Sequence, residues 1–220
     1  MEFPLSGERT GFGKKYRPEE LATPEAFFKN PETVWEWYFW RRRIIAKAEP
    51  NPAHMALKKL EDDLGNNFWI ITQNVDGLHQ KAGCKNVVEL HGNIWFDRCT
   101  SCSYIWEDRE IEFKGVPKCP KCSSMARPDV VWFGEAVRNI DRAYELASNA
   151  DIMLVIGTSA QVYPAALLPM VTKENGGKII EINLERTQLS YVADEVHLGK
   201  AGEILPKIVE KILSERKRIL

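Results

Sequence analysis

The chain has 220 residues, which is long enough to bury one sizeable domain with a small inserted module. Its formal net charge of -1 provides no basic field for a specific nucleic-acid partner, and no apolar stretch reaches the roughly 20 residues that cross a bilayer, so no membrane partner is expected. Four of the five cysteines form two tight pairs and the first residues lack the features of a secretion signal, so we expect a metal-binding protein of the reducing cytoplasm.

Helices and strands are predicted to alternate along the chain. Residues 31–47 favour a helix because they hold good helix formers and no internal glycine or proline. Asn51 and Pro52 are typical of a helix start, and apolar residues recur behind them at helical spacing. The other predicted helices are 138–149, 164–174 and 201–216, and the predicted strands are 68–72, 152–156 and 178–182. This alternation, with continuously apolar strands, indicates an α/β fold with a parallel sheet covered on both faces.

Each predicted strand is followed by a short polar loop, at residues 73–76, 157–159 and 183–185. In open α/β sheets, ligands bind at the carboxyl ends of the strands. A single polar strand end without a ligand is common, but three in one sheet are not. We therefore expect the three loops to face one crevice that binds a ligand.

Two Cys-x-x-Cys pairs, separated by 16 residues, interrupt the alternation in a segment rich in turn residues. Thiolates at this spacing favour a tetrahedral Zn²⁺ ion. Four protein ligands leave no open position, so the zinc is expected to be structural. A ribbon of this kind, taken alone, is equally compatible with a nucleic-acid-binding or protein-binding module. The predicted ligands are Cys99, Cys102, Cys119 and Cys122.

Six motifs in order resemble the sirtuin family of NAD-dependent protein-lysine deacylases. They are TQNVDGLHQKAG (72–83), ELHGNIW (89–95), RPDVVWFGE (127–135), GTSAQVYPAALLP (157–169), EINLE (181–185) and GKAGEILP (199–206). The resemblance implies a doubly wound, Rossmann-like NAD-binding domain formed by residues 1–95 and 128–220. It also implies an inserted zinc-binding module at 96–127 and a helical segment of the small domain at 15–50.

The resemblance implies a reaction in which the acyl group of a protein lysine is removed at the expense of NAD, giving nicotinamide and O-acyl-ADP-ribose. His91 is implied to be the general base, because a neutral imidazole can take a proton from a ribose hydroxyl near neutral pH. The other histidines, His54, His79 and His197, lack a comparable setting and are expected to be structural.

The same resemblance assigns the strand-end loops to the cofactor and one strip to the acylated-lysine substrate. Amide, carboxylate and hydroxyl groups suit the carboxamide, sugar and phosphate groups of NAD. A strip that pairs with a peptide backbone is a form of strand addition. The implied cofactor residues are Gln73, Asn74, Val75 and Asp76 at nicotinamide and ribose, Gly157, Thr158 and Ser159 at phosphate or ribose, Asn183, Leu184 and Glu185 at the adenosine ribose, and Ala201 at adenine. The implied substrate residues are Val131, Trp132, Phe133 and Gly134.

Tyr38 and Arg41 are three residues apart in the predicted helix at 31–47, so they share one face. A Tyr-x-x-Arg at this place resembles the sirtuin branch that prefers succinyl and malonyl groups. A guanidinium can grip a carboxylate through two hydrogen bonds, and the phenol can add a third. The alternative is that Tyr38 packs in the core and Arg41 is the first of three surface arginines. Because Arg42 and Arg43 follow directly, the arginine that matches the motif could also be one position away.

The N-terminal sequence departs from the family, which begins with a buried strand and a Gly-Ala-Gly-x-Ser loop. Gly7, Gly11 and Gly13 are present, but no apolar strand precedes them, so we expect the first strand of the fold to be missing. Its loss would remove ~8–15 kcal/mol of burial and the donors that cradle a pyrophosphate, so NAD affinity is expected to be poor. The alternatives to deacylation are therefore ADP-ribosyl transfer and an inactive zinc-binding scaffold.

Overall fold

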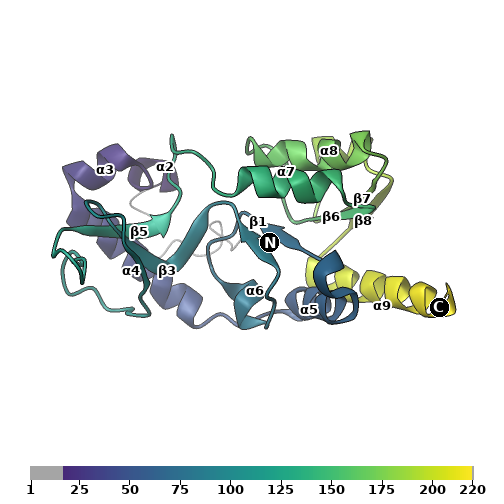
Figure 1. Cartoon of the computed structure of the whole chain (residues 1–220), viewed down its shortest axis with the longest axis horizontal. Helices are drawn as coiled ribbons and strands as arrows, with labels where there is room; N and C mark the ends of the chain where they lie inside the picture. Colours follow the sequence, from purple (N-terminus) through teal and green to yellow (C-terminus); the bar gives the residue numbers. More distant parts are fainter. Residues whose placement is uncertain (1–16, 220) are drawn as a thin grey trace.

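The computed structural model describes residues 17–219, which combine a parallel α/β part with a smaller antiparallel part (Figure 1). The expectation about Gly7, Gly11 and Gly13 lies outside the described residues. The helices are α2 (Pro18–Leu21), α3 (Pro24–Lys29), α4 (Pro31–Ala46), α5 (Pro52–Leu64), α6 (Leu78–Lys81), α7 (Ile140–Ser148), α8 (Leu168–Glu174) and α9 (Ala201–Ile219). The strands are β1 (Ile70–Thr72), β2 (Val87–Glu89), β3 (Gly92–Cys99), β4 (Ile105–Glu107), β5 (Ala126–Val130), β6 (Ile152–Ile156), β7 (Lys178–Asn183) and β8 (Glu195–Leu198). Within residues 17–219, no helix is long and apolar enough to cross a membrane.

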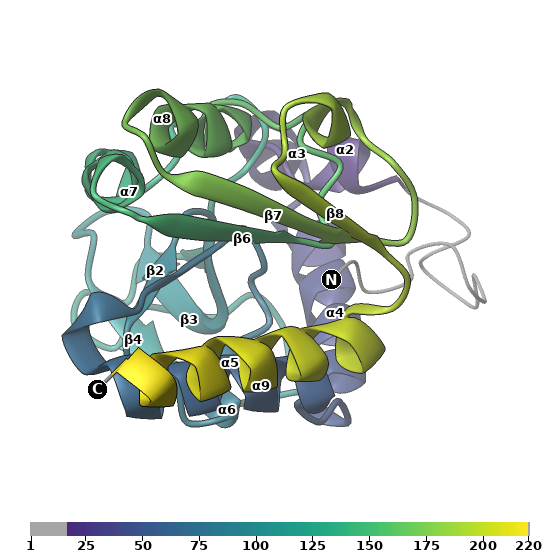
Figure 2. The ribbon, with the colours of Figure 1, turned by 90° about the vertical axis from the view of Figure 1, so that its right-hand side faces the viewer.

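The α/β architecture with parallel strands is confirmed. Strands β6, β7 and β8 form one parallel sheet in that order, and β1 pairs with β2 in parallel. Helices α7 and α8 lie over one face of the β6–β8 sheet, and α9 lies beneath the other (Figure 2). A hydrophobic cluster that includes Leu57, Ile182 and Leu205 joins α5, β7 and α9.

Within residues 17–219, these parallel strands are not all hydrogen-bonded into one sheet. The parallel strands fall into two sheets, because within the described residues β1 pairs only with β2 and β6 only with β7. The run 152–156 is therefore not buried throughout, and the side chain of Ile152 is 47% exposed. The predicted strand at 68–72 is also shorter than expected, since a 3-10 turn at Gly65–Asn67 delays its start to Ile70.

The start of α5 is formed as predicted. The side-chain oxygen of Asn51 accepts hydrogen bonds from the amides of Ala53 and His54, at 2.9 and 3.3 Å, and Pro52 occupies the first helical position. Such a cap satisfies amides that have no partner inside the helix. It fixes where α5 begins.

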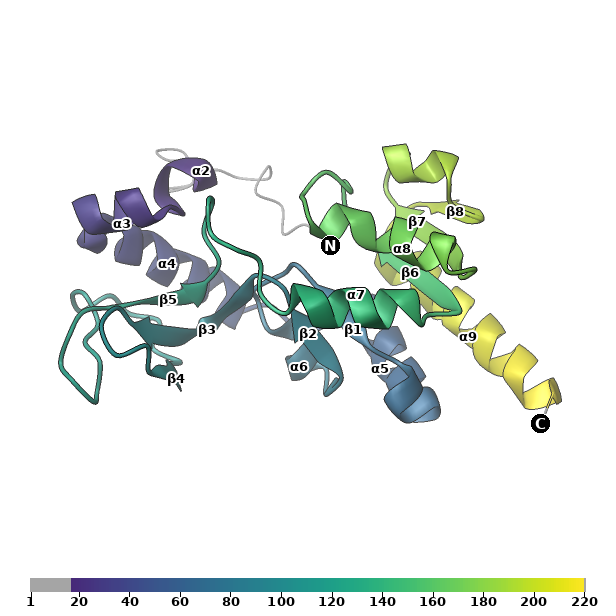
Figure 3. The same cartoon turned by 45° about the horizontal axis from the view of Figure 1, so that its top comes forward.

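The smaller part of the molecule is an antiparallel sheet in the order β4-β3-β5, with α4 packed against it (Figure 3). Its core is aromatic, and Trp35, Tyr38 and Trp132 are all 2% exposed or less. At the first residue of β3, Gly92 has φ +76° and a Cβ atom there would lie 2.1 Å from the carbonyl oxygen of Asp129. Only glycine therefore lets β3 and β5 approach at this point.

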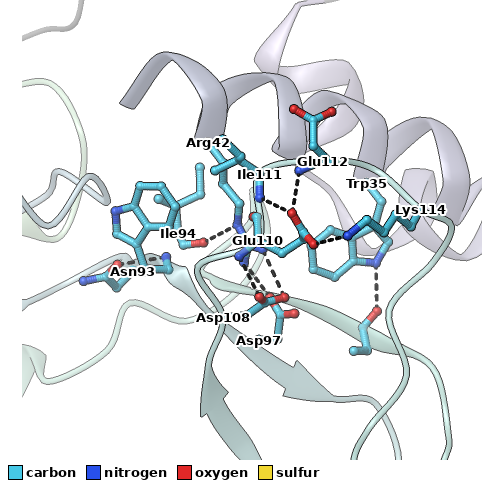
Figure 4. A network of polar contacts seen from close by, with 12 residues as sticks. Trp35, Arg42, Asn93, Ile94, Asp97, Asp108, Glu110, Ile111, Glu112 and Lys114 are labelled. Atoms are coloured by element: carbon cyan, nitrogen blue, oxygen red, sulfur yellow. Dashed lines mark hydrogen bonds and ion pairs between the residues drawn. The ribbon is translucent and has the colours of Figure 1, made fainter. Parts of the chain in front are cut away.

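Arg42 is buried at the junction of α4, β3 and the loop after β4 (Figure 4). Its guanidinium donates to the carboxylate of Asp97 at 2.7 Å and to the carbonyl oxygen of Ile94 at 2.8 Å. It also lies 3.4 Å from a carboxylate oxygen of Asp108. Burial raises the pKa of Asp97 to about 7, although the charge of Arg42 opposes that rise.

Replacing Arg42 by Met is expected to lower the free energy of unfolding by ~3–5 kcal/mol, because the carboxylate of Asp97 would be left buried without its partner. Urea unfolding at pH 8, with the metal-loaded protein, measures this change. The matched control is Arg43→Met: Arg43 is 38% exposed and its nitrogen lies 3.9 Å from Glu112, so a change of ~0–1 kcal/mol is expected. Equal losses in the two variants would contradict the prediction.

Candidate functional site

His91 lies between β2 and β3 with its ring held in one orientation. Its Nδ1 atom is 3.1 Å from the carbonyl oxygen of Gln73. Because a carbonyl can only accept, Nδ1 carries the proton and the lone pair remains on Nε2. Burial lowers the pKa of His91, even though the bond to Gln73 opposes the shift. The imidazole is therefore neutral near pH 7 and able to accept a proton through Nε2.

The loop 73–77 follows β1 and is folded back by short-range hydrogen bonds. The amide of Asn74 donates to the hydroxyl of Thr72 at 3.0 Å. The carboxylate of Asp76 accepts from the amide of Leu78 at 2.8 Å, and Asp76 is 6% exposed. Gly77 has φ +73°, which glycine adopts without strain. Gln73, Asn74, Val75 and Asp76 thus form one hydrogen-bonded loop, in which Gln73 contacts His91.

The other two strand-end loops meet at the carboxyl end of the β6–β8 sheet. The side-chain amide of Asn183 donates to the carbonyl oxygen of Thr158 at 2.8 Å. Gly157, at φ +59°, donates its amide to Ile182 at 2.9 Å. The remaining predicted residues of this group are Ser159, Leu184 and Glu185, which are exposed, and Ala201, which is half-buried as the first residue of α9. The structure therefore brings together the residues expected at phosphate and adenosine.

The strip of Val131, Trp132, Phe133 and Gly134 follows β5 and runs past His91. The amide of Val131 donates to the carbonyl oxygen of His91 at 2.8 Å. The amides of Trp132 and Phe133 are also bonded within the chain, to Glu135 and Ala22. Pairing with a peptide backbone would thus use other polar groups of the strip. The ring of Phe133 is 56% exposed and available to a ligand.

Tyr38 and Arg41 share one face of α4, as predicted. The hydroxyl of Tyr38 accepts a hydrogen bond from the indole of Trp132 at 2.8 Å, so it contacts the strip. The guanidinium of Arg41 lies over the ring of Trp37, 4.8 Å from its centre. Burial lowers the pKa of Arg41, which the charge of Asp76 partly offsets. Arginine nonetheless stays charged at neutral pH.

The four predicted zinc ligands converge on one point. Their Sγ atoms all lie within 4.8 Å of one another, and the Cys99–Cys122 and Cys102–Cys119 pairs are 3.4 and 3.6 Å apart. A zinc tetrahedron with ~2.3 Å bonds has edges of ~3.8 Å, so this cluster fits the ion. The amides of Ser101 and Cys102 each donate to the sulfur of Cys99 at 3.3 Å, which favours a thiolate.

Several residues near the site were not identified from the sequence. His54 and His79, which were expected to be structural, pack against each other with ring centres 4.9 Å apart and ring planes tilted by 57°. Burial lowers the pKa of His79 to about 4, so this ring is neutral at pH 7. The motif at 89–95 also contains Glu89, Asn93 and Trp95, which contact the loop 73–77 or its helix α6. Their spacing in the sequence carries no signal for these contacts, which depend on the fold.

Comparisons with known proteins agree along nearly the whole chain. A model of the Sir2 family matches residues 6–164. An NAD-dependent protein deacylase of Thermococcus kodakarensis is 54% identical over 220 residues, covering 94% of this chain and 85% of that relative. A solved Sir2 homolog–NAD complex is 47% identical with a TM-score of 0.86, covering 91% of this chain and 79% of that one. A solved Sir2 bound to an acetylated peptide is 34% identical with a TM-score of 0.80, covering 87% and 83%.

Proposed function

The chain belongs to the Sir2 family, the sirtuins, and on that premise we propose that it removes acyl groups from protein lysines with NAD as co-substrate. The products are nicotinamide, the free lysine and O-acyl-ADP-ribose. The observation that carries the proposal is the arrangement around His91, whose neutral ring presents Nε2 beside the loop 73–77 and the strip 131–134. A reducing compartment such as the cytoplasm suits the four zinc-binding thiolates.

In this proposal, NAD would supply an electrophilic ribose carbon, from which the acyl oxygen of the substrate would displace nicotinamide. Asn74 and Asp76 would hold the carboxamide and ribose, and Thr158, Ser159 and Glu185 would bind phosphate and the adenosine ribose. His91 would take the proton of a ribose hydroxyl, so that the hydroxyl oxygen can attack the former acyl carbon, and water would complete the release of the free lysine. The hydrogen bond to Gln73 keeps the ring in the tautomer that this step needs.

The direct test is nicotinamide release by the protein in the presence of NAD and an acetyl-lysine peptide, with the peptide product weighed by mass spectrometry. The proposal is supported if the peptide loses its acyl group and nicotinamide is released only when both NAD and the peptide are present. A peptide that gains the mass of ADP-ribose would instead establish ADP-ribosyl transfer. If the zinc-loaded protein releases no nicotinamide, the remaining interpretation is an inactive zinc-binding scaffold.

We propose further that the protein accepts acidic acyl groups, because the three neighbouring arginines of α4 differ in their acidic partners. Arg42 is buried in an ion pair with Asp97, and Arg43 lies 3.9 Å from Glu112. Arg41 has no acidic side chain within 4.0 Å among residues 17–219, and it shares the face of Tyr38. Asp76 acts on Arg41 only from beyond ion-pair distance, and a partly buried cation that makes no ion pair suits a ligand with a carboxylate. The register with Arg41 is the one that this geometry supports.

Replacing Arg41 by Met is expected to lower kcat/KM on a succinyl-lysine peptide by ~10–100-fold, because a charged hydrogen-bonded contact is lost. On the acetyl-lysine peptide, a change within ~3-fold is expected, since no carboxylate is present. Arg43→Met is the matched control and should leave the ratio of the two activities unchanged. An equal loss on both peptides would show that Arg41 has only a structural role.

A further inference from the structure

The cofactor loop and the segment that carries His91 are joined by a row of hydrogen bonds. Four carbonyl oxygens of residues 72–76 each accept a bond from residues 90–95. The bonds run from Leu90 N to Thr72 O (2.9 Å), from His91 Nδ1 to Gln73 O (3.1 Å), from Ile94 N to Val75 O (2.8 Å) and from Trp95 Nε1 to Asp76 O (2.9 Å). Two of these four bonds come from side chains. His91 is assigned to the proposed chemistry, whereas Trp95 is not.

Trp95 connects this loop to the rest of the small domain. Its ring is 6% exposed and lies against Gly77, where an added Cβ atom would be 3.2 Å from the indole. Its carbonyl oxygen accepts from the amide of Asp108 at 2.8 Å, and the guanidinium of Arg109 lies 5.0 Å from its ring centre. The indole therefore bridges the zinc-bearing segment and the turn that contains Asp76.

A second side-chain contact supports the same turn. The carboxylate of Glu89 accepts hydrogen bonds from Gln80 and from Asn93, both at 2.7 Å. Gln80 belongs to α6, directly after the loop 73–77, while Asn93 precedes Trp95 in β3. Glu89 thus holds both sides of the turn from the end of β2.

We propose that Trp95 is a positioning residue for NAD. Its indole N–H fixes the carbonyl of Asp76, and thereby sets the direction of the Asp76 carboxylate and the Asn74 amide toward the nicotinamide and ribose. The inference rests on the proposed deacylase function. Without the N–H, the buried carbonyl of Asp76 is left without its partner, and the turn relaxes to satisfy it. The bound geometry of NAD depends on that turn, whereas the fold as a whole does not.

The test is the variant Trp95→Phe, which keeps an aromatic ring and removes the N–H. We expect its KM for NAD to rise ~10-fold, equivalent to ~1.4 kcal/mol, with a parallel rise in the nicotinamide concentration that inhibits by half. The matched control is Trp69→Phe. The indole of Trp69 donates to the carbonyl oxygen of Asn66 at 3.0 Å, which is the same kind of bond away from the site. The Trp69→Phe variant should have the same KM for NAD as the unmodified protein.

Thermal unfolding of both variants separates positioning from stability, because a less stable protein loses active molecules and hence kcat without a change in KM. If Trp95→Phe does not fold, Trp95→Met, which also lacks the N–H donor, takes its place and is expected to raise the KM for NAD in the same direction. An unchanged KM for NAD in the folded variant overturns the inference. An unmodified protein without NAD-dependent deacylation overturns the proposed function instead, so the two failures are distinct.

Discussion

Replacing His91 by Asn is expected to lower kcat for deacylation by ~10²–10⁴-fold, the usual contribution of a positioned general base. Asparagine keeps a side-chain amide that can donate to Gln73, so the local structure should persist. It has no lone pair basic enough to take the ribose proton. Steady-state assays with an acetyl-lysine peptide and saturating NAD measure the loss.

The exchange of labelled nicotinamide into NAD provides an internal control for His91→Asn. Nicotinamide departs before the step assigned to His91, so exchange in the presence of acyl peptide should largely survive. His197→Asn is a matched variant, because His197 is half-buried in β8 and its Nε2 contacts the carboxylate of Glu195 at 3.1 Å. Loss of exchange and deacylation by the same factor in His91→Asn would contradict the role as base.

The pH profile gives a second readout of the same residue. Burial lowers the pKa of His91 below its ordinary value, so the neutral form that acts as base persists to more acidic pH. We therefore expect kcat/KM to fall as pH is lowered, with its half-point below 6.5. A half-point above 6.5 would indicate a different group.

Removing the metal is expected to have the largest effect on stability. Structural zinc contributes ~10–16 kcal/mol in small zinc-binding peptides, against ~5–15 kcal/mol for the stability of a whole domain. The variant Cys119→Ser should therefore lose zinc and unfold the segment between β3 and β5, which has little hydrophobic core of its own. Metal content by mass spectrometry and circular dichroism report the two events.

Cys84→Ala is the control for the loss of a thiol. Cys84 is 4% exposed and lies far from the cluster in sequence, and burial raises the pKa of its thiol to about 11. This variant should keep one zinc ion per chain. A Cys119→Ser protein that retains its fold without metal would show that packing alone stabilises the module.

Local features of the fold could be predicted from the sequence, whereas contacts across it could not. The cap at Asn51, the helix that carries Tyr38 and Arg41, and the apolar strands all follow from spacing and residue type. The division of the parallel strands into two sheets does not, because strand pairing depends on neighbours distant in sequence. The same limit applies to the site. Helical spacing placed Arg41 beside Tyr38, but only the structure shows that Arg42 is committed to an ion pair with Asp97.

The exposure of the zinc cluster has a further consequence for how the protein responds to oxidants. Cys99 and Cys119 are each 2% exposed, but Cys102 and Cys122 face the solvent. Each buried sulfur therefore lies within 3.6 Å of an exposed one, close enough for a pair to oxidise to a disulfide. A disulfide cannot bind zinc, so peroxide would release the ion and unfold the segment that contacts Trp95. Deacylase activity would then depend on the thiol balance of its surroundings.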